Sequence, residues 1–325
     1  MKKFTFLLVG FVLFSSHDMF LKMDTHFLQP NTLSAIQLFN GTFEKSENII
    51  DRIRMKDVSL VGNGMRSSVD SSQWSEVEYI TLLNFKTGEA GTWVAGVSTK
   101  PNNIELSAKD FNEYLEHDGV LDMLDWRKEN NTLDKSAVEK YSKHVKTIFQ
   151  VGDKKTDDWK TVLGYPIEFV PVRNPYELKK GDTLQIKLLS NGKPLPNQLV
   201  YVGAGTEDHG HSHEEGHTHD HEAEAHHHHD ATRLRTDADG LISIQITSEG
   251  YWYLRTIQME HSEEPELTHE SNWATLTFQV GQGHLHDDDN HHHPHDHSHG
   301  IPSFVYWMIG ILLIAGLYLG IRKKR

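Results

Sequence analysis

Apolar and polar residues alternate along much of the chain, and this period of two constrains the fold more than any other feature. The alternation is clear at 34–39, 77–82 and 92–97, and it returns at 184–188 and 241–246. Turn-forming residues such as asparagine and glycine separate these segments. Successive side chains of a strand point to opposite faces of a sheet, so the pattern predicts short strands with one buried face. We therefore expect a mainly β protein built of antiparallel sandwiches.

Between 107 and 160 the pattern changes to a helical one. Ser107 and Asp110 are suited to cap a helix, and the apolar residues from Phe111 to Leu124 follow a helical spacing. A second helix is expected from Asp134 to about Phe149. The sequence thus predicts a helical hairpin that lies on the first β domain.

The two ends of the chain read as targeting segments. Lys2 and Lys3 precede an apolar run at 4–14 and two small serines, as in a secretory signal peptide; an uncleaved N-terminal anchor is the alternative. Residues 303–321 are 19 uncharged residues, enough for a membrane-spanning helix of about 28 Å. The basic residues 322–325 should stay in the cytoplasm. A buried core helix is the alternative for the C-terminal run.

The expected organisation follows from these segments. The two β-sandwich domains are expected to be immunoglobulin-like or carboxypeptidase-regulatory-like. The order is a signal peptide (1–16), an N-terminal β-sandwich (17–106), a helical hairpin (107–160), a C-terminal β-sandwich (161–282) with a histidine-rich insertion (207–230), a histidine- and aspartate-rich linker (283–302), a transmembrane helix (303–321) and a cytoplasmic basic tail (322–325). This topology places an ectodomain in the periplasm or outside the cell.

Charge and cysteine content narrow the function. The six basic residues at the two ends do not belong to the ectodomain, so its 26 basic and 46 acidic residues give a net charge of −20. Such a surface repels nucleic acid and attracts cations. The chain has no cysteine, which excludes disulfides, thiolate ligands and a lipoprotein anchor. Any bound metal must therefore be held by nitrogen and oxygen.

Two tracts rich in histidine and carboxylate are the strongest functional signal. Imidazole is a neutral nitrogen ligand that suits nickel, cobalt, zinc and copper. The tracts lack apolar residues for a core, so we expect both to be disordered without metal. A solvated polar loop is the alternative. The candidate ligands are His209, His211, His213, His217, His219, His221, His226, His227, His228 and His229 in the first tract, and His284, His286, His291, His292, His293, His295, His297 and His299 in the second.

Three further histidines are candidate ligands. Cleavage after Ser16 would leave His17 at the N-terminus, where its amine and ring could chelate one ion together. His261 and His269 flank an acidic loop. Ordinary surface or hydrogen-bonded histidines are the alternative for this group.

Two apparent motifs are better explained without a catalytic or calcium-binding role. His213 to His217 matches the metalloprotease pattern H-E-x-x-H, but Gly210 and Gly216 argue against the helix that this chemistry needs. Asp237 to Gly240 matches part of a calcium loop, but a β-turn is expected because the loop's outer acidic ligands are missing. No nucleophile or phosphate-binding motif stands out, and we expect a protein that is not an enzyme.

Several turn and core motifs resemble one known family. They are Gly164-Tyr165-Pro166-Ile167-Glu168-Phe169-Val170-Pro171, Asn174-Pro175-Tyr176, Lys180-Gly181-Asp182, Gly192-Lys193-Pro194-Leu195, Thr236-Asp237-Ala238-Asp239-Gly240 and Gly250-Tyr251-Trp252, with His17-Asp18 and Tyr141-Ser142-Lys143. The chain resembles the exported bacterial domain-of-unknown-function family usually described as the periplasmic component of cobalt/nickel uptake systems of the ABC or ECF type. The resemblance implies a two-part β architecture and a role in metal supply.

These observations lead to one expected function and two alternatives. The expected protein is membrane-anchored, binds nickel or cobalt outside the cytoplasm and supplies it to a partner permease. An envelope buffer against excess zinc or copper is the first alternative. An adhesin-like structural surface protein is the second, and it alone predicts no metal binding.

Overall fold

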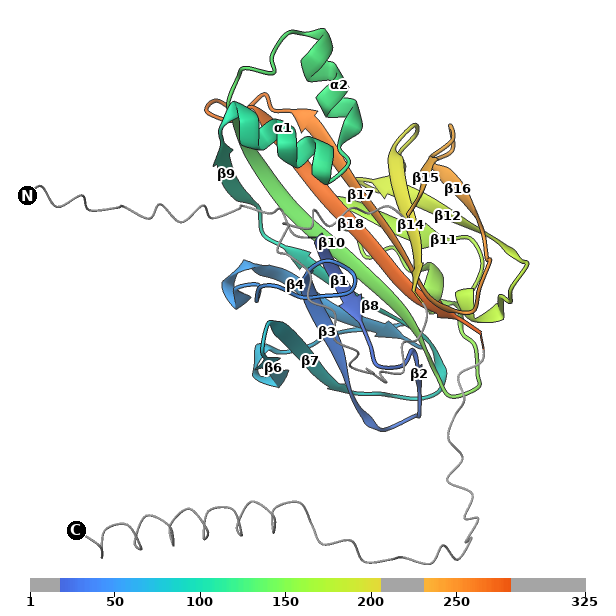
Figure 1. The fold of residues 1–325 in the computed structure, drawn as a ribbon. Coiled ribbons are helices and arrows are strands. Elements are labelled where there is room, and N and C mark those ends of the chain that lie inside the picture. Colours follow the sequence, from blue (N-terminus) through green and yellow to red (C-terminus); the bar gives the residue numbers. More distant parts are fainter. Residues whose placement is uncertain (1–17, 206–230, 282–325) are drawn as a thin grey trace, which may run out of the picture. The chain divides into compact units, whose positions relative to one another are not determined.

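The computed structural model describes residues 18–205 and 231–281 (Figure 1). The predicted signal peptide, both histidine tracts, the predicted transmembrane helix and the basic tail lie outside these residues. Within the described ranges, no helix is both long and apolar enough to cross a bilayer.

The described fold is mainly β, as the alternation predicts, and its centre is a ten-stranded sheet. The strand order is β15 (Thr232–Arg235), β14 (Leu199–Gly205), β17 (Gly250–His261), β18 (His269–Val280), β10 (Ala137–Val151), β8 (Gly91–Thr99), β4 (Met55–Gly62) and β5 (Met65–Ser68), with β2 (Phe27–Leu28) and β9 (Asn102–Leu106) paired to β10. All of these pairs are antiparallel except β10 with β18 and β10 with β2.

Two smaller sheets pack on opposite faces of the central sheet. One has the order β1 (Asp18–Lys22), β3 (Leu33–Gly41), β7 (Ile80–Lys86), β6 (Trp74–Val77). The other contains β11 (Ile167–Pro171), β12 (Thr183–Ser190), β13 (Lys193–Pro194) and β16 (Leu241–Gln245). Short 3-10 helices lie at Arg52–Arg54, Ser71–Gln73, Asp157–Lys160 and Pro175–Glu177.

Strand β10 shows why there are three layers. Val145 and Phe149 pack in the core shared with β1, β3 and β7. Ile148, on the other face of the strand, packs in the core shared with β11, β12 and β16. The central sheet is therefore buried on both faces and runs through the boundaries predicted between the two sandwich domains, so that the two sandwiches share one sheet.

The predicted second helix at 134–149 is wrong, because residues 137–149 of this segment are in β10. A strand buried on both faces loses the polar alternation by which strands are recognised. Ten consecutive residues at the end of β10 are buried, and the apolar positions within them happen to fit a helical spacing.

The helical pair is instead α1 (Ala108–His117) and α2 (Leu121–Glu129). Ser107 caps α1 as predicted, because its side chain accepts a hydrogen bond from the Asp110 backbone N–H. The two helices pack on Ile257 of β17 and Trp273 of β18, at one end of the central sheet (Figure 1). The helices thus contact β17 and β18 of the expected second domain as well as Leu106 of β9 in the expected first domain.

The alternating segment 77–82 is also not one strand. Glu78 has a φ of 52° and forms the turn between β6 and β7, which pair with each other from Val77 and Ile80. The alternation continues across a tight turn, so the pattern alone could not show where the chain reverses direction.

Candidate functional site

The first histidine tract connects two strands that are hydrogen-bonded to each other. β14 and β15 pair antiparallel, with Val202 opposite Thr232, and β15 is the edge strand of the central sheet. The ten tract histidines from His209 to His229 lie outside the described residues, as do the eight from His284 to His299. The tract at 207–230 is therefore inserted between two strands, as the sequence predicts, and β15, which the sequence did not predict, puts the insertion at a sheet edge.

The second tract follows β18, which ends at Val280. This strand lies between β17 and β10 in the central sheet. His17 also lies outside the described residues and directly precedes Asp18, the first residue of β1.

Two of the remaining histidines are buried core residues. The His26 Nε2 atom lies 3.0 Å from the Thr147 hydroxyl, and burial lowers the pKa of His26 to about 3. His144 lies between the hydroxyls of Ser98 and Ser142, at 2.9 and 3.0 Å, and burial lowers its pKa to about 4. Both rings are neutral at physiological pH and serve the packing of the core.

His117 is half-exposed at the end of α1. Its Nδ1 lies 3.0 Å from the Asp118 carboxylate, and this hydrogen bond raises the pKa of His117. The arrangement matches an ordinary charge-paired histidine at a helix C-terminus.

The structure brings His261 and His269 together. The two residues are opposite each other in the β17–β18 pair, and their ring centroids are 5.0 Å apart. His261 is exposed, whereas His269 is 3% exposed. His261 ends β17 and His269 begins β18, so the two lie at either end of the connecting loop, and their role as ligands stays a prediction. Among the described residues, no group of three or more histidine, aspartate or glutamate side chains is arranged to hold a metal ion.

A set of buried charges links β1, β17 and the α1–α2 connection. The Arg255 guanidinium lies 3.3 Å from the Asp18 carboxylate and donates a hydrogen bond of 3.0 Å to the Asp118 backbone carbonyl. Asp118 Oδ2 is buried with no hydrogen-bond partner within the described residues, and burial raises the pKa of Asp118. Sequence reasoning missed these roles, although Asp18 is part of a quoted family motif.

Lys143 and Glu139 extend this layer along β10. Burial lowers the pKa of Lys143 to about 8 and raises that of Glu139 to about 7. Glu139 accepts hydrogen bonds from the hydroxyls of Tyr114 and Ser271. Glu139 fastens α1 to the central sheet through the Tyr114 hydroxyl, and the Asp18–Arg255 pair fastens β1 to it, so these buried charges are compensated across elements.

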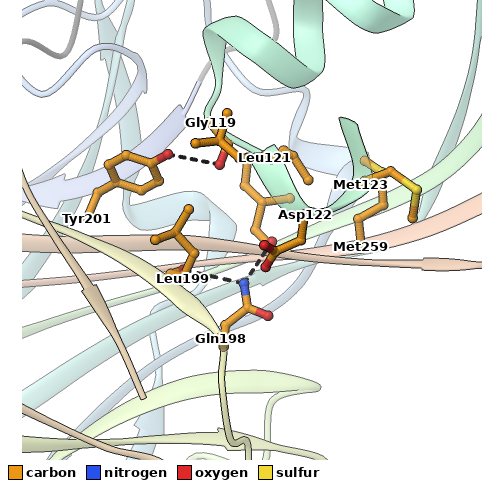
Figure 2. Close-up of a pocket in the computed structure, with 10 residues that line it drawn as sticks. Gly119, Leu121, Asp122, Met123, Gln198, Leu199, Tyr201 and Met259 are labelled. Carbon is orange, nitrogen blue, oxygen red and sulfur yellow. Dashed lines mark hydrogen bonds between the residues drawn. The ribbon is translucent and has the colours of Figure 1, made fainter. Parts of the chain in front are cut away.

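A small pocket lies where the α1–α2 connection meets β14 and β17 (Figure 2). Its volume is ≈ 50 Å³, enough for a few water molecules. The Tyr201 hydroxyl donates to the Gly119 carbonyl at one side, and the Gln198 amide donates to the Leu199 and Ile257 carbonyls at the other. The polar groups at the rim thus already have partners, and Asp122 binds Arg235.

Comparison with models of protein families shows to which family the chain belongs. A family described as a domain of unknown function (DUF4198) matches residues 14–260. The chain belongs to this family. The DUF4198 match includes β1 to most of β17 and also the first histidine tract. It leaves out β18, which pairs with both β17 and β10.

Solved structures give only distant likenesses to this DUF4198 chain. A mutant of Salmonella alpha-2-macroglobulin is 10% identical with a TM-score of 0.21, over 80% of this chain and 15% of that chain. A DUF4785 family protein from Legionella pneumophila is 10% identical with a TM-score of 0.21, over 72% of this chain and 51% of that chain. The D0-D1 domain of intimin is 13% identical with a TM-score of 0.17, over 80% of this chain and 97% of that chain. The chain thus spans 15% and 51% of the first two, and similarity at this level carries no argument. No curated protein matches the sequence significantly.

Proposed function

We propose that this protein is an exported, membrane-anchored binder of divalent transition metals that supplies nickel or cobalt to an uptake permease in the same membrane. The observation that carries the proposal is the composition of the two tracts, which hold 18 of the 24 histidines together with carboxylates and no basic residue. Neutral imidazoles with nearby carboxylates favour nickel, cobalt, zinc and copper over calcium and magnesium.

The fold supports a binding role for the first tract. The connection between β14 and β15 begins and ends at a sheet edge, where a long insertion costs little stability. Many different sets of tract histidines can surround one ion, so binding is multiple and exchangeable. Such a tract collects and passes on ions, and no catalytic step is required of the protein.

Anchoring and export rest on the two apolar segments. The signal-like segment at 1–16 and the uncharged run at 303–321 support an acidic ectodomain held at the membrane outside the cytoplasm, where a permease would receive its ions.

Metal accumulation in cells tests this function. A strain carrying the native chain is compared with a strain lacking the protein and with one whose 18 tract histidines are replaced by glutamine. At low external nickel, the strain with the glutamine variant should accumulate as little metal as the strain without the protein. The variant His117→Gln should behave like the native chain. Equal nickel accumulation by the strains with the glutamine and native chains contradicts the proposal. If the strain with the glutamine variant instead loses only its survival in excess zinc or copper, the protein is a protective buffer.

A further inference from the structure

The end of the β17–β18 hairpin carries two histidines whose rings meet on one face of the sheet. His261 and His269 are directly opposed in an antiparallel pair, and their ring centroids lie 5.0 Å apart. We propose that His261 and His269 together bind one divalent transition-metal ion at a defined site on the folded domain. This inference refines the proposed function, because it adds one ordered site to the many equivalent ligand sets of the tracts.

The distance between the rings fits two ligands of one ion. Zinc, for example, binds imidazole nitrogen at about 2.0–2.1 Å in tetrahedral geometry. Two rings bound to one ion in this way have centroids about 5 Å apart, given a nitrogen about 1 Å from each ring centre. The observed separation of 5.0 Å matches this value.

The hydrogen bonds of Thr268 favour one tautomer of His269. The Thr268 hydroxyl oxygen accepts from the Val138 backbone N–H at 2.9 Å, and it lies 3.0 Å from the Val138 carbonyl oxygen and 2.7 Å from His269 Nδ1. With the hydroxyl hydrogen directed to the carbonyl, Nδ1 bears the ring hydrogen and Nε2 carries the free lone pair. A metal-binding histidine typically donates its second ring N–H to a neighbouring oxygen in this way.

The lone pair on His269 Nε2 accepts no hydrogen bond within the described residues. The atom is buried and has no hydrogen-bond partner there, and an unsatisfied buried polar atom costs about 1–3 kcal/mol. Burial, with His261 and Arg127 nearby, lowers the pKa of His269 to about 4. The ring is therefore neutral in the state that a metal ion requires.

The surroundings allow access and exchange. His261 is exposed, and its other neighbour is the Trp126 ring, with centroids 3.9 Å apart. Arg127 of α2 lies near the buried ring, and Glu139 is opposite His269 in the β10–β18 pair. Both side chains are held by their own hydrogen bonds. Two protein nitrogens leave the remaining ligand positions open, so an ion can enter and leave from solvent.

The test uses the full-length chain in detergent with all 18 tract histidines replaced by glutamine. Nickel or zinc alone is titrated into this chain by calorimetry. We expect one ion per chain, with the affinity reduced at least tenfold in His261→Gln and in His269→Gln. His261 is exposed, so that variant keeps the fold, and equal thermal unfolding without metal verifies this. The matched control His117→Gln replaces a histidine outside the pair and should bind like its parent.

Two results overturn the site. Either the tract-free chain binds no ion, or its one ion is unaffected by His261→Gln. The proposed function is judged separately, by whether the native chain binds more ions than the tract-free chain. A failure of one therefore leaves the other standing.

Discussion

Deleting Glu207–Asp230 should leave the fold intact and raise its stability slightly. Val202 and Thr232 are opposed in the β14–β15 pair, and residues 203–231, 29 in number, connect them. Removal of the 24 tract residues leaves five, a length common in β-hairpin connections. Gly205 at the end of β14 keeps its place opposite Tyr251 of β17.

The size of the effect follows from the length of the connection. Each doubling of a flexible loop costs about 0.6 kcal/mol in closure entropy. The nearly sixfold shortening is about 2.5 doublings, so the free energy of unfolding should rise by about 1–2 kcal/mol. For a domain of this size the unfolding midpoint should rise by about 2–8 °C. The tract also carries eight acidic residues, and their loss reduces self-repulsion in the same direction.

Thermal unfolding in the presence of a chelator measures this effect. The matched control replaces 207–230 by a glycine-serine linker of 24 residues, which keeps the length and should unfold like the native chain apart from the charge effect. A midpoint lowered by more than a few degrees in the deletion would refute the reasoning, because it would show that the tract packs on the domain.

Three further predictions concern buried charge and pH. Glu168→Gln should destabilise the domain by about 3–5 kcal/mol, measured by urea unfolding, because it leaves the fully buried Lys146 ammonium, 2.9 Å away, without its counter-charge. A cost below about 1 kcal/mol counts against a charge effect. The pKa of His144 is lowered to about 4, so the unfolded chain takes up its proton first and stability should fall as pH drops from about 6.5 towards 4. His144→Asn should make this pH dependence shallower, and an unchanged slope contradicts the assignment. Nickel capacity of the native chain should be near full at about pH 7.5 and largely lost by about pH 5.5, because histidine binds metal only when unprotonated; undiminished capacity at the lower pH means that carboxylates are the ligands.

The strands that could be predicted are those with one buried and one exposed face. β12 and β16 alternate between buried and more exposed residues, and their pattern is plain in the sequence. β10 could not be recognised, because the layers on its two faces are contributed by segments far away along the chain. The shared central sheet was missed for the same reason, since the β10–β18 pair joins residues about 130 positions apart.

In the candidate site, too, the features set by local sequence could be predicted and those set by contacts between distant residues could not. The tracts and the position of the first one between two strands follow from composition and local pattern. The turn at Asp237 was also predicted, and its side chain accepts hydrogen bonds from the Asp239 and Leu241 backbone N–H groups. By contrast, the contact between Arg255 and Asp18 joins opposite ends of the described chain, and no local pattern indicates it. His261 and His269 could be named as candidates, but their pairing depends on the register of the hairpin.

Nickel stoichiometry by equilibrium dialysis at pH 7.5 tests the central claim most directly. The native full-length chain is compared with the chain whose 18 tract histidines are glutamine, which keeps length and carboxylates unchanged. The account predicts several ions per native chain and one in the glutamine chain, at the pair of His261 and His269. Equal stoichiometry in the two chains would contradict it, because the tract histidines would then not be the ligands.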